Sequence, residues 1–183
     1  IKNHFLAVLA ALVLPGIAII STGAALASPG SRTTTELYAE DWESGGADWS
    51  TDSATWQIGE PTYGINYAHS GDLCAGTVLN GNYPNNADTR LISPSIDLPA
   101  NPADGALWLR YWQWFYFNPV DSGIVEISRN GGPWEALPET QVEGAIGGVW
   151  TQALHDISAY AGDSVRLSFH LLTNASSVAF GWY

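Results

Sequence analysis

The residues best suited to binding chemistry lie in one aromatic run, ALWLRYWQWFYF, at positions 106–117. Alternation along an extended strand divides this run between two faces. One face carries Leu107, Leu109, Tyr111, Gln113, Phe115 and Phe117. The other carries Trp108, Arg110, Trp112, Trp114 and Tyr116. Flat aromatic rings offer sugars and peptides a large contact area at low entropic cost. We therefore predict that the second face is a ligand-binding platform, with burial of both faces by the opposite sheet and loops as the alternative.

A second group of candidate residues is acidic. Glu40, Asp41 and Glu43 occur in AEDWESGG, where we expect the first strand, and a polar loop follows at 69–72. Oxygen ligands of this kind suit Ca²⁺, which binds carboxylates, amides and carbonyls. Ordinary turn chemistry is the alternative, above all for the Asn-rich loop GNYPNNAD at 81–88. A carboxylate that points inward from a strand is costly to bury unless it has a partner such as a metal ion. Glu43 is therefore the best candidate for a metal ligand.

Sequence motifs of hydrolytic enzymes are missing. The chain has neither an H-E-x-x-H helix nor a G-x-S-x-G elbow, and its four histidines never occur at metal-ligand spacing. Glycoside hydrolysis needs two carboxylates that face each other across a cleft, and no such pair is indicated. The sequence therefore predicts a protein without catalytic activity.

The first 27 residues have the order of an export signal. Lys2 is followed by an apolar run at 5–20, and Ala25-Leu26-Ala27 closes the segment as an A-x-A site. This order is typical of a secretory signal helix, with a retained membrane anchor as the alternative. We predict a signal peptide at 1–27, a linker at 28–36 and a secreted, extracellular domain at 37–183, with no membrane contact after cleavage.

Composition narrows the range of partners. Charged residues make up 13% of the chain, and its net charge of −12 would become −13 without residues 1–27, with five arginines against 18 acidic residues. An acidic surface repels phosphate backbones, so we expect no nucleic-acid partner. Cys74 is the single cysteine, so an internal disulfide is excluded, and its apolar surroundings predict a buried, inert thiol.

Short apolar runs cut by Gly, Pro, Asn and Asp predict an all-β fold. The expected strands are 37–43, 54–59, 74–80, 89–93, 95–98, 106–117, 123–129, 134–137, 149–157, 165–172 and 178–183. In 165–172, alternation predicts one buried face and one wet face, the latter with Arg166, Ser168 and His170. Asn130-Gly131 between two apolar runs predicts a hairpin. Strands of this number and spacing favour a two-sheet antiparallel β-sandwich.

Taken in order, the short motifs resemble a known family. They are W-E-S-G, T-W-Q-I-G, A-H-S-G-D, G-N-Y-P-N-N-A-D, L-I-S-P-S-I-D-L, the Trp-rich strand, V-E-I-S-R-N-G-G, D-I-S-A-Y-A-G and a final G-W-Y. Over residues 37–183 this order resembles the MAM-like, choice-of-anchor J-type jelly-roll modules of secreted bacterial proteins, which occur beside immune inhibitor A-like metallopeptidases. The resemblance implies a jelly-roll β-sandwich with a non-catalytic role in adhesion, ligand binding or support of a neighbouring domain.

The same resemblance implies a structural Ca²⁺. Its ligands would be the first-strand glutamate, here Glu43, and the S-G loop, here Ser70, Gly71 and Asp72. Similar modules carry a further aspartate after G-W-Y, and the present sequence ends at Tyr183. We therefore expect that ligand and part of the last strand to be lacking here. The ion would pin the first strand to the loop and neutralise local acidic charge.

These observations together predict a secreted, non-catalytic module for binding or adhesion. Its expected partner is a glycan or an extracellular protein surface, bound by Trp108, Arg110, Trp112, Trp114 and Tyr116. The alternative is an accessory domain of a secreted metallopeptidase or other hydrolase, with the catalytic part outside this sequence. A small hydrolase in its own right is disfavoured by the missing motifs.

Overall fold

The regular structure of the chain consists almost entirely of β-strands. The computed structural model describes the backbone of residues 19–23 and the whole of residues 35–102 and 105–183. Within these ranges the helical structure is a single 3₁₀ turn, η1 (Ser158–Tyr160). The predicted all-β class is therefore confirmed. No helix in the described part of the chain is long and apolar enough to span a membrane.

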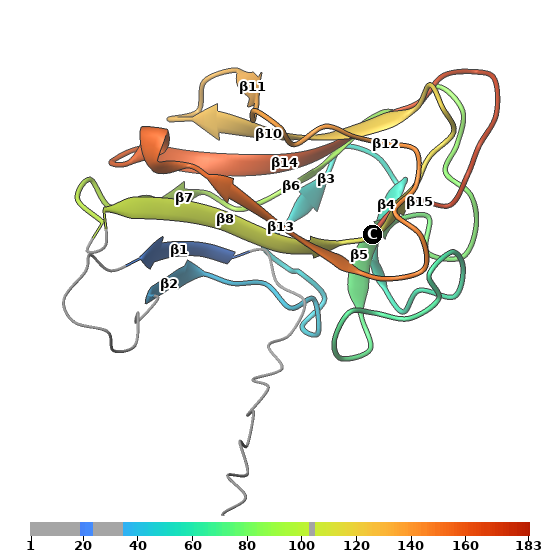
Figure 1. The fold of residues 1–183 in the computed structure, drawn as a ribbon, viewed down its shortest axis with the longest axis horizontal. Helices are drawn as coiled ribbons and strands as arrows, with labels where there is room; N and C mark the ends of the chain where they lie inside the picture. Colours follow the sequence, from blue (N-terminus) through green and yellow to red (C-terminus); the bar gives the residue numbers. More distant parts are fainter. Residues whose placement is uncertain (1–18, 24–34, 103–104) are drawn as a thin grey trace, which may run out of the picture.

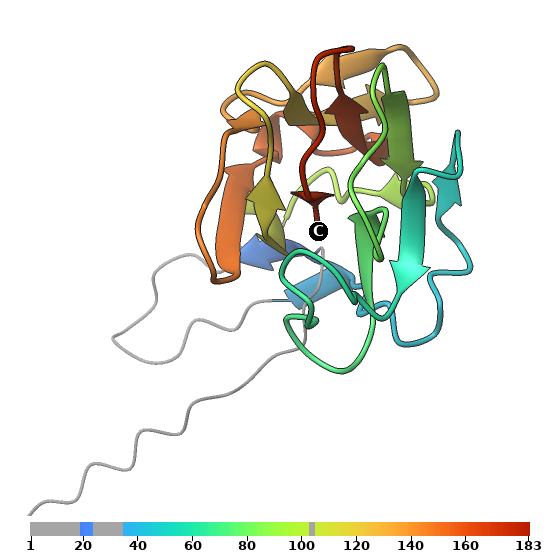
Figure 2. The same cartoon turned by 90° about the vertical axis from the view of Figure 1, so that its right-hand side faces the viewer.

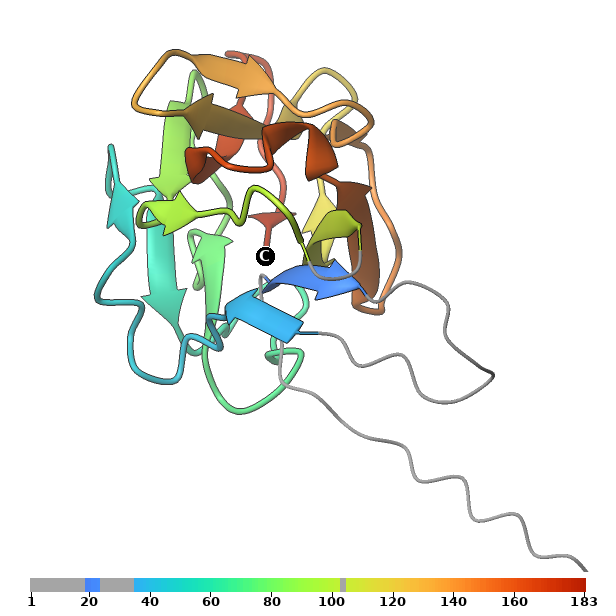
Figure 3. The same cartoon turned by 90° about the vertical axis from the view of Figure 1, so that its left-hand side faces the viewer.

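The smaller of the two main sheets is built around the aromatic run. Its order is β13 (Thr151–Asp156), β8 (Ala106–Gln113), β1 (Ile19–Gly23) and β2 (Thr35–Tyr38), and neighbouring strands are antiparallel. Figure 1 shows β8 between β1 and β13, and Figure 3 shows β1 and β2 at the end of this layer. β8 is thus a central strand along its first half.

The larger sheet has seven strands. Its main path runs β11 (Trp134–Ala136), β10 (Ser122–Arg129), β14 (Ser164–Leu172), β6 (Asp88–Ile92) and β3 (Ser50–Thr51). β12 (Val142–Glu143) also pairs with β10, and β7 (Ile96–Asp97) pairs with β14. Asn130 and Gly131, at the turn between β10 and β11, have φ of 52° and 74°. The hairpin predicted from Asn130-Gly131 is confirmed, because such turns need positive φ at both central residues.

Two short ribbons complete the fold. β4 (Trp56–Gly59) pairs with β5 (Cys74–Thr77), and β9 (Phe115–Tyr116) pairs with β15 (Gly181–Trp182). The backbone of Tyr183 exchanges hydrogen bonds of 2.8 and 2.9 Å with that of Trp114, and the N–H of Trp182 donates to the Thr77 hydroxyl at 2.9 Å. The last residues therefore join β5 to the end of the aromatic run, as Figure 2 shows.

The hydrophobic core lies between the two main sheets. The inner faces of β8, β10 and β14 are almost completely buried, with Leu107, Leu109, Val125, Ile127, Val165, Leu167 and Leu171 at 0–1% exposure. The Tyr111 ring meets the Phe169 ring edge-on across the gap, with centroids 5.1 Å apart. The period-two alternation of these strands predicted this core, since one face of each strand must leave water.

The outer face of β14 differs from the prediction. Arg166 is exposed, but Ser168 and His170 are 0% and 5% exposed, so the expected wet face is wrong for these two residues. Polar neighbours cover them: Glu126 of β10 accepts from the Ser168 hydroxyl at 3.3 Å and lies 3.1 Å from His170 Nδ1. A face of alternating polar residues can be buried when the neighbouring strands supply partners for it.

The N-terminal predictions need a second correction. The first expected strand, 37–43, ends at Tyr38 as β2, and Glu43 lies in the turn that follows it. Most of the predicted signal helix lies outside the described residues, and only residues 19–23 of it are described. Ile19–Gly23 is the strand β1, and it pairs with Ala106–Arg110 of β8. The predicted cleavage after Ala27 also lies outside the described residues.

Candidate binding surface

The outer face of the β8–β13 pair is partly open to solvent. Trp108, Arg110 and Trp112 alternate with buried residues along β8 and are each half-buried. Their partners across to β13 are the exposed residues Asp156, Leu154 and Gln152, respectively. Leu154 is 55% exposed, which is high for a large apolar side chain in a strand. Three of the five predicted binding residues therefore share one accessible surface, which we call the β8 outer face.

The structure does not bring the other two predicted residues onto this surface. Trp114 is 4% exposed and belongs to a small core with Ile65, Cys74, Leu79 and Tyr183. Its indole N–H donates to the Gly147 carbonyl. Tyr116 is 44% exposed but lies past the end of β8, edge-on to Phe180 at 5.2 Å. The predicted five-residue platform is thus divided into an open part, a buried part and a separate tyrosine.

An apolar cleft begins where the β8 outer face ends. Tyr111, Trp112 and Gln113 all line it, and three consecutive strand residues can do so only at the strand edge, because their side chains alternate. β1 pairs with β8 only as far as Arg110, so this edge is free of β1. The cavity measures about 50 Å³ and is lined by Trp42, Trp56, His69, Ser70, Leu73, Cys74, Ala75, Leu91, Tyr111, Trp112, Gln113, Trp150, Phe169, Trp182 and Tyr183.

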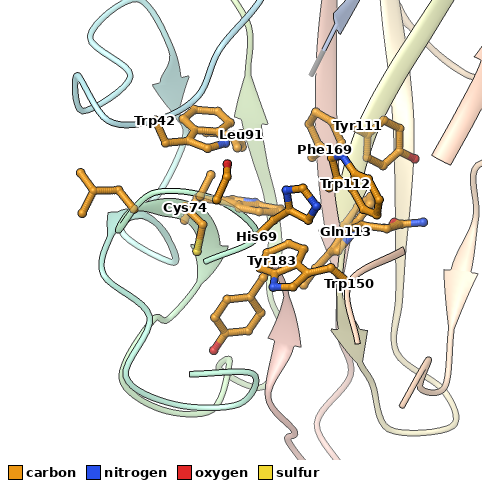
Figure 4. A pocket seen from close by; sticks show the side chains of 15 residues that line it. Trp42, His69, Cys74, Leu91, Tyr111, Trp112, Gln113, Trp150, Phe169 and Tyr183 are labelled. Atoms are coloured by element: carbon orange, nitrogen blue, oxygen red, sulfur yellow. Dashed lines mark hydrogen bonds between the residues drawn. The ribbon is translucent and has the colours of Figure 1, made fainter. Parts of the chain in front are cut away.

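His69 and two tryptophans form the mouth of the cleft. The imidazole stacks on the Trp112 indole, with centroids 3.9 Å apart and 19° between the planes, and meets Trp150 edge-on at 6.1 Å. Figure 4 shows the three rings together. Burial lowers the pKa of His69, so the ring is neutral at pH 7. Its Nδ1 is buried and has no hydrogen-bond partner in the described residues.

The floor of the cleft is held by the C-terminal residues. The indole N–H of Trp182 donates to Gln113 Oε1 at 3.0 Å, and its ring packs against Phe169 with centroids 5.4 Å apart. Trp182 itself is 1% exposed. The hydrogen bond to Trp182 therefore holds the Gln113 side chain in place. Gln113 forms part of the cleft wall, and its Oε1 is already used in this bond. Cys74 also lines the cleft, and burial raises the pKa of its thiol to about 12. The predicted burial of the cysteine is confirmed, and its lack of reactivity stays a prediction.

The loop that carries His69 is anchored by Glu43. Glu43 Oε1 accepts hydrogen bonds from the backbone N–H groups of Asp72 at 3.0 Å and Leu73 at 2.9 Å. Gly71 has φ of +61°, and a Cβ atom there would lie 2.3 Å from Glu43 Oε1. Glycine is required at this position because the backbone and the carboxylate approach each other so closely.

These are the residues for which the family resemblance implies Ca²⁺: Glu43, Ser70, Gly71 and Asp72. The structure does bring Glu43 against the 70–73 loop, but the loop presents N–H donors to the carboxylate. Ca²⁺ needs six to eight oxygen ligands. In the described part of the chain no group of three or more His, Cys, Asp or Glu side chains is placed to hold a metal ion. These contacts do not test the binding of an ion, and Ca²⁺ stays a prediction.

Sequence reasoning missed a charged network on the outer face of the larger sheet. Arg90 Nε donates to Glu126 Oε2 at 2.8 Å, and His170 Nε2 lies 2.8 Å from Asp88 Oδ1. Burial acts to raise the pKa of Glu126, but the hydrogen bonds and charges of Arg90 and His170 lower it further than burial raises it. The alternating polar positions of 88–92, 123–129 and 165–172 were the available signal. They could be joined only once the strand order was known.

The known proteins that are similar to this chain include a longer bacterial protein. No family model matches the chain. Bacillopeptidase F of Bacillus subtilis (strain 168) is 34% identical over 127 residues, which make up 68% of this chain and 8% of that protein. The chain thus spans a small segment of this relative. The likeness to MAM-like modules stays a prediction.

A solved structure with partial overlap is that of TmCBM61 in complex with β-1,4-galactotriose. Its TM-score is 0.49 and its sequence identity 15%, over 75% of this chain and 88% of that one. This overlap is too weak to assign a ligand. The class that the strands themselves define is an all-β fold of two facing antiparallel sheets, and within it the chain is similar to one part of a longer peptidase.

Proposed function

We propose that the chain is a non-catalytic binding module for a glycan. The glycan would lie along the β8 outer face and reach the cleft at His69. The observation that carries the proposal is the position of Trp112, which belongs to both: it follows Trp108 and Arg110 along the strand and stacks on His69 at the cleft mouth. An indole that is half-buried on one surface and shared with a cleft is a fixed, partly solvated contact for a sugar ring.

The composition of the cleft favours carbohydrate binding. Ligand sites combine mostly apolar walls with a few polar groups that set orientation. Here the walls are aromatic and aliphatic, and the imidazole of His69 is a polar group at the mouth. A neutral imidazole can donate or accept one hydrogen bond with a sugar hydroxyl.

The same lining supports binding over hydrolysis at this place. The described residues around the cleft include neither Asp nor Glu. Glycoside hydrolysis commonly requires two carboxyl groups on opposite sides of the bond that breaks. Within the described residues His69 has no carboxylate partner to orient its ring, so an acid–base pair is not assembled at the cleft.

Tryptophan substitution tests the proposal. The full chain is titrated with a panel of neutral and acidic polysaccharides, followed by intrinsic fluorescence and by affinity electrophoresis. Trp112→Ala should abolish the response. Trp134→Ala is the matched control, because that half-buried indole lies on β11 and contacts Arg166, away from the β8 outer face. Unchanged circular dichroism would show that both variants fold.

Two results would overturn the proposal that this surface binds a glycan. If no polysaccharide binds, or if Trp112→Ala binds as the wild-type chain does, the proposed surface is wrong. Capture of a defined extracellular protein through Trp108 and Trp112, without any glycan response, would assign the surface to a protein partner instead. Both outcomes are read from the same variants.

A second candidate concerns the longer protein. The 34% identity to a segment of bacillopeptidase F favours a role as an accessory module beside a peptidase. Sequencing of the reading frame on both sides of this segment tests it. A peptidase domain in the same frame would support the role, and its absence from the complete frame would contradict it.

A further inference from the structure

Arg110 differs from the other arginines of the described chain. Each of the other three has a partner: Arg90 with Glu126 at 2.8 Å, Arg129 with Asp163 at 2.6 Å, and Arg166 over the Trp134 ring at 5.5 Å. Among the described residues the side chain of Arg110 has no ion pair, hydrogen bond or ring contact, although its backbone pairs with β1 and β13. Its guanidinium is thus unpaired within the described residues, although the chain carries 18 acidic residues.

The neighbours of Arg110 explain why no acid reaches it. Directly across on β13 stands Leu154, which is apolar and exposed. The carboxylate on the same face of β13 is Asp156, one diagonal step away, opposite Trp108. That carboxylate accepts a hydrogen bond from the Ser158 backbone N–H at 2.8 Å. Residues 1–35 contain no Asp or Glu, and Glu36, the first acidic residue, lies on β2, which β1 separates from β8.

The position of Arg110 between two indoles suits it to bind a charged group on a sugar. Trp108 and Trp112 precede and follow Arg110 by two residues on the same face, so the three side chains are spaced about 6–7 Å apart. A guanidinium offers a planar pair of N–H donors that matches the two oxygens of a carboxylate. A sugar ring stacked on an adjacent indole can place a carboxylate substituent over the arginine.

We propose that the β8 outer face binds a glycan that carries a carboxylate sugar, a uronic or sialic acid, with its carboxylate on Arg110. This inference rests on the proposed glycan-binding function and names the class of glycan. The net charge of −12 opposes a ligand with many negative charges. The favoured ligand therefore has one acidic sugar in a neutral chain, and a polyuronate binds less well.

Matched sugar pairs test the inference by isothermal titration calorimetry of the full chain. The pairs are 3′-sialyllactose with lactose, and aldotetraouronic acid with xylotriose. Within the pair that binds, we expect the acidic member to bind about fivefold to tenfold more tightly, as suits a charge-assisted contact at a partly exposed site. Arg110→Gln should remove this preference, so that the acidic and the neutral member of the pair bind with equal affinity.

Arg166→Gln is the control, because it removes a positive charge from the outer face of β14 and lowers the net charge equally. It should keep the preference for the acidic sugar. Equal affinity for both members of a binding pair, or an Arg110→Gln variant that keeps the preference, would overturn the acidic ligand and leave glycan binding intact. Tighter binding of 3′-sulfolactose than of 3′-sialyllactose would overturn the proposal that the acidic group is a carboxylate. If no member of either pair binds, the acidic ligand fails, and the polysaccharide panel decides separately whether the proposed function stands.

Discussion

Replacement of Gly71 by alanine tests how the cleft is held in place. Gly71 has φ of +61°, and the added Cβ would lie 2.3 Å from Glu43 Oε1. The left-handed conformation costs an L-residue about 1–2 kcal/mol. The carboxylate must also move away, which breaks its hydrogen bonds to the N–H groups of Asp72 and Leu73. Because these bonds are exposed, we assign them about 1 kcal/mol together. The expected loss of unfolding free energy is about 2–3 kcal/mol.

A matched glycine separates the two contributions. Gly144 has φ of +66°, and a Cβ atom there meets nothing within 4 Å, so Gly144→Ala should lose only the conformational part. Urea unfolding followed by circular dichroism measures both variants. Gly71→Ala should be less stable than Gly144→Ala by about 1 kcal/mol. Since the displaced loop carries His69, glycan binding should also weaken in Gly71→Ala alone. Equal stability of the two variants would refute the anchoring role of Glu43.

Three further outcomes are expected. Because Arg90 and His170 lower the pKa of Glu126 below its usual 4.5 against the effect of burial, their interaction stabilises the fold above that pH and is lost as the pH falls further. The melting temperatures of wild type and Glu126→Gln should therefore converge below about pH 4.5, and a constant difference would contradict the ion pair. The Cys74 thiol, with its pKa near 12, should react with a thiol reagent at pH 8 only in denaturant, and rapid native labelling would show an open site. Glu43→Ala should lower the melting temperature equally in Ca²⁺ and in EDTA, whereas a Ca²⁺-dependent rise seen only in the wild type would support the ion that the resemblance implies.

Alternation predicted the strands with one buried face well, because that pattern states which side chains leave water. In β10 and β14 the predicted core positions, such as Val125 and Leu167, are 0% and 1% exposed. Strand ends were predicted less well. Glu43 was predicted to lie in a strand, yet the chain turns at Trp42, where φ is +67°. A tryptophan does not indicate such a conformation in a sequence.

Local sequence patterns could not predict which side chains are buried by segments that are distant in the sequence. Trp112 and Trp114 lie two residues apart on one face of the aromatic run, and the sequence treats them alike. The 60–74 segment and the C-terminal Tyr183 cover Trp114, while Trp112 stays partly open beside His69. The same holds for His170, whose burial depends on side chains from β6 and β10. Such contacts follow from strand order, which period-two patterns leave undetermined.

The strand β1 lies within the segment predicted to direct export, and it borders the proposed binding face. Ile19–Gly23 supplies the backbone partners of Ala106–Arg110 and falls inside the leader predicted at 1–27. If a signal peptidase removes that leader, β8 loses its neighbour on one side, and the peptide groups beside Trp108 and Arg110 face water or another strand. Maturation would then turn an interior strand into a sheet margin open to β-strand addition from a second polypeptide, next to the surface proposed to hold sugar.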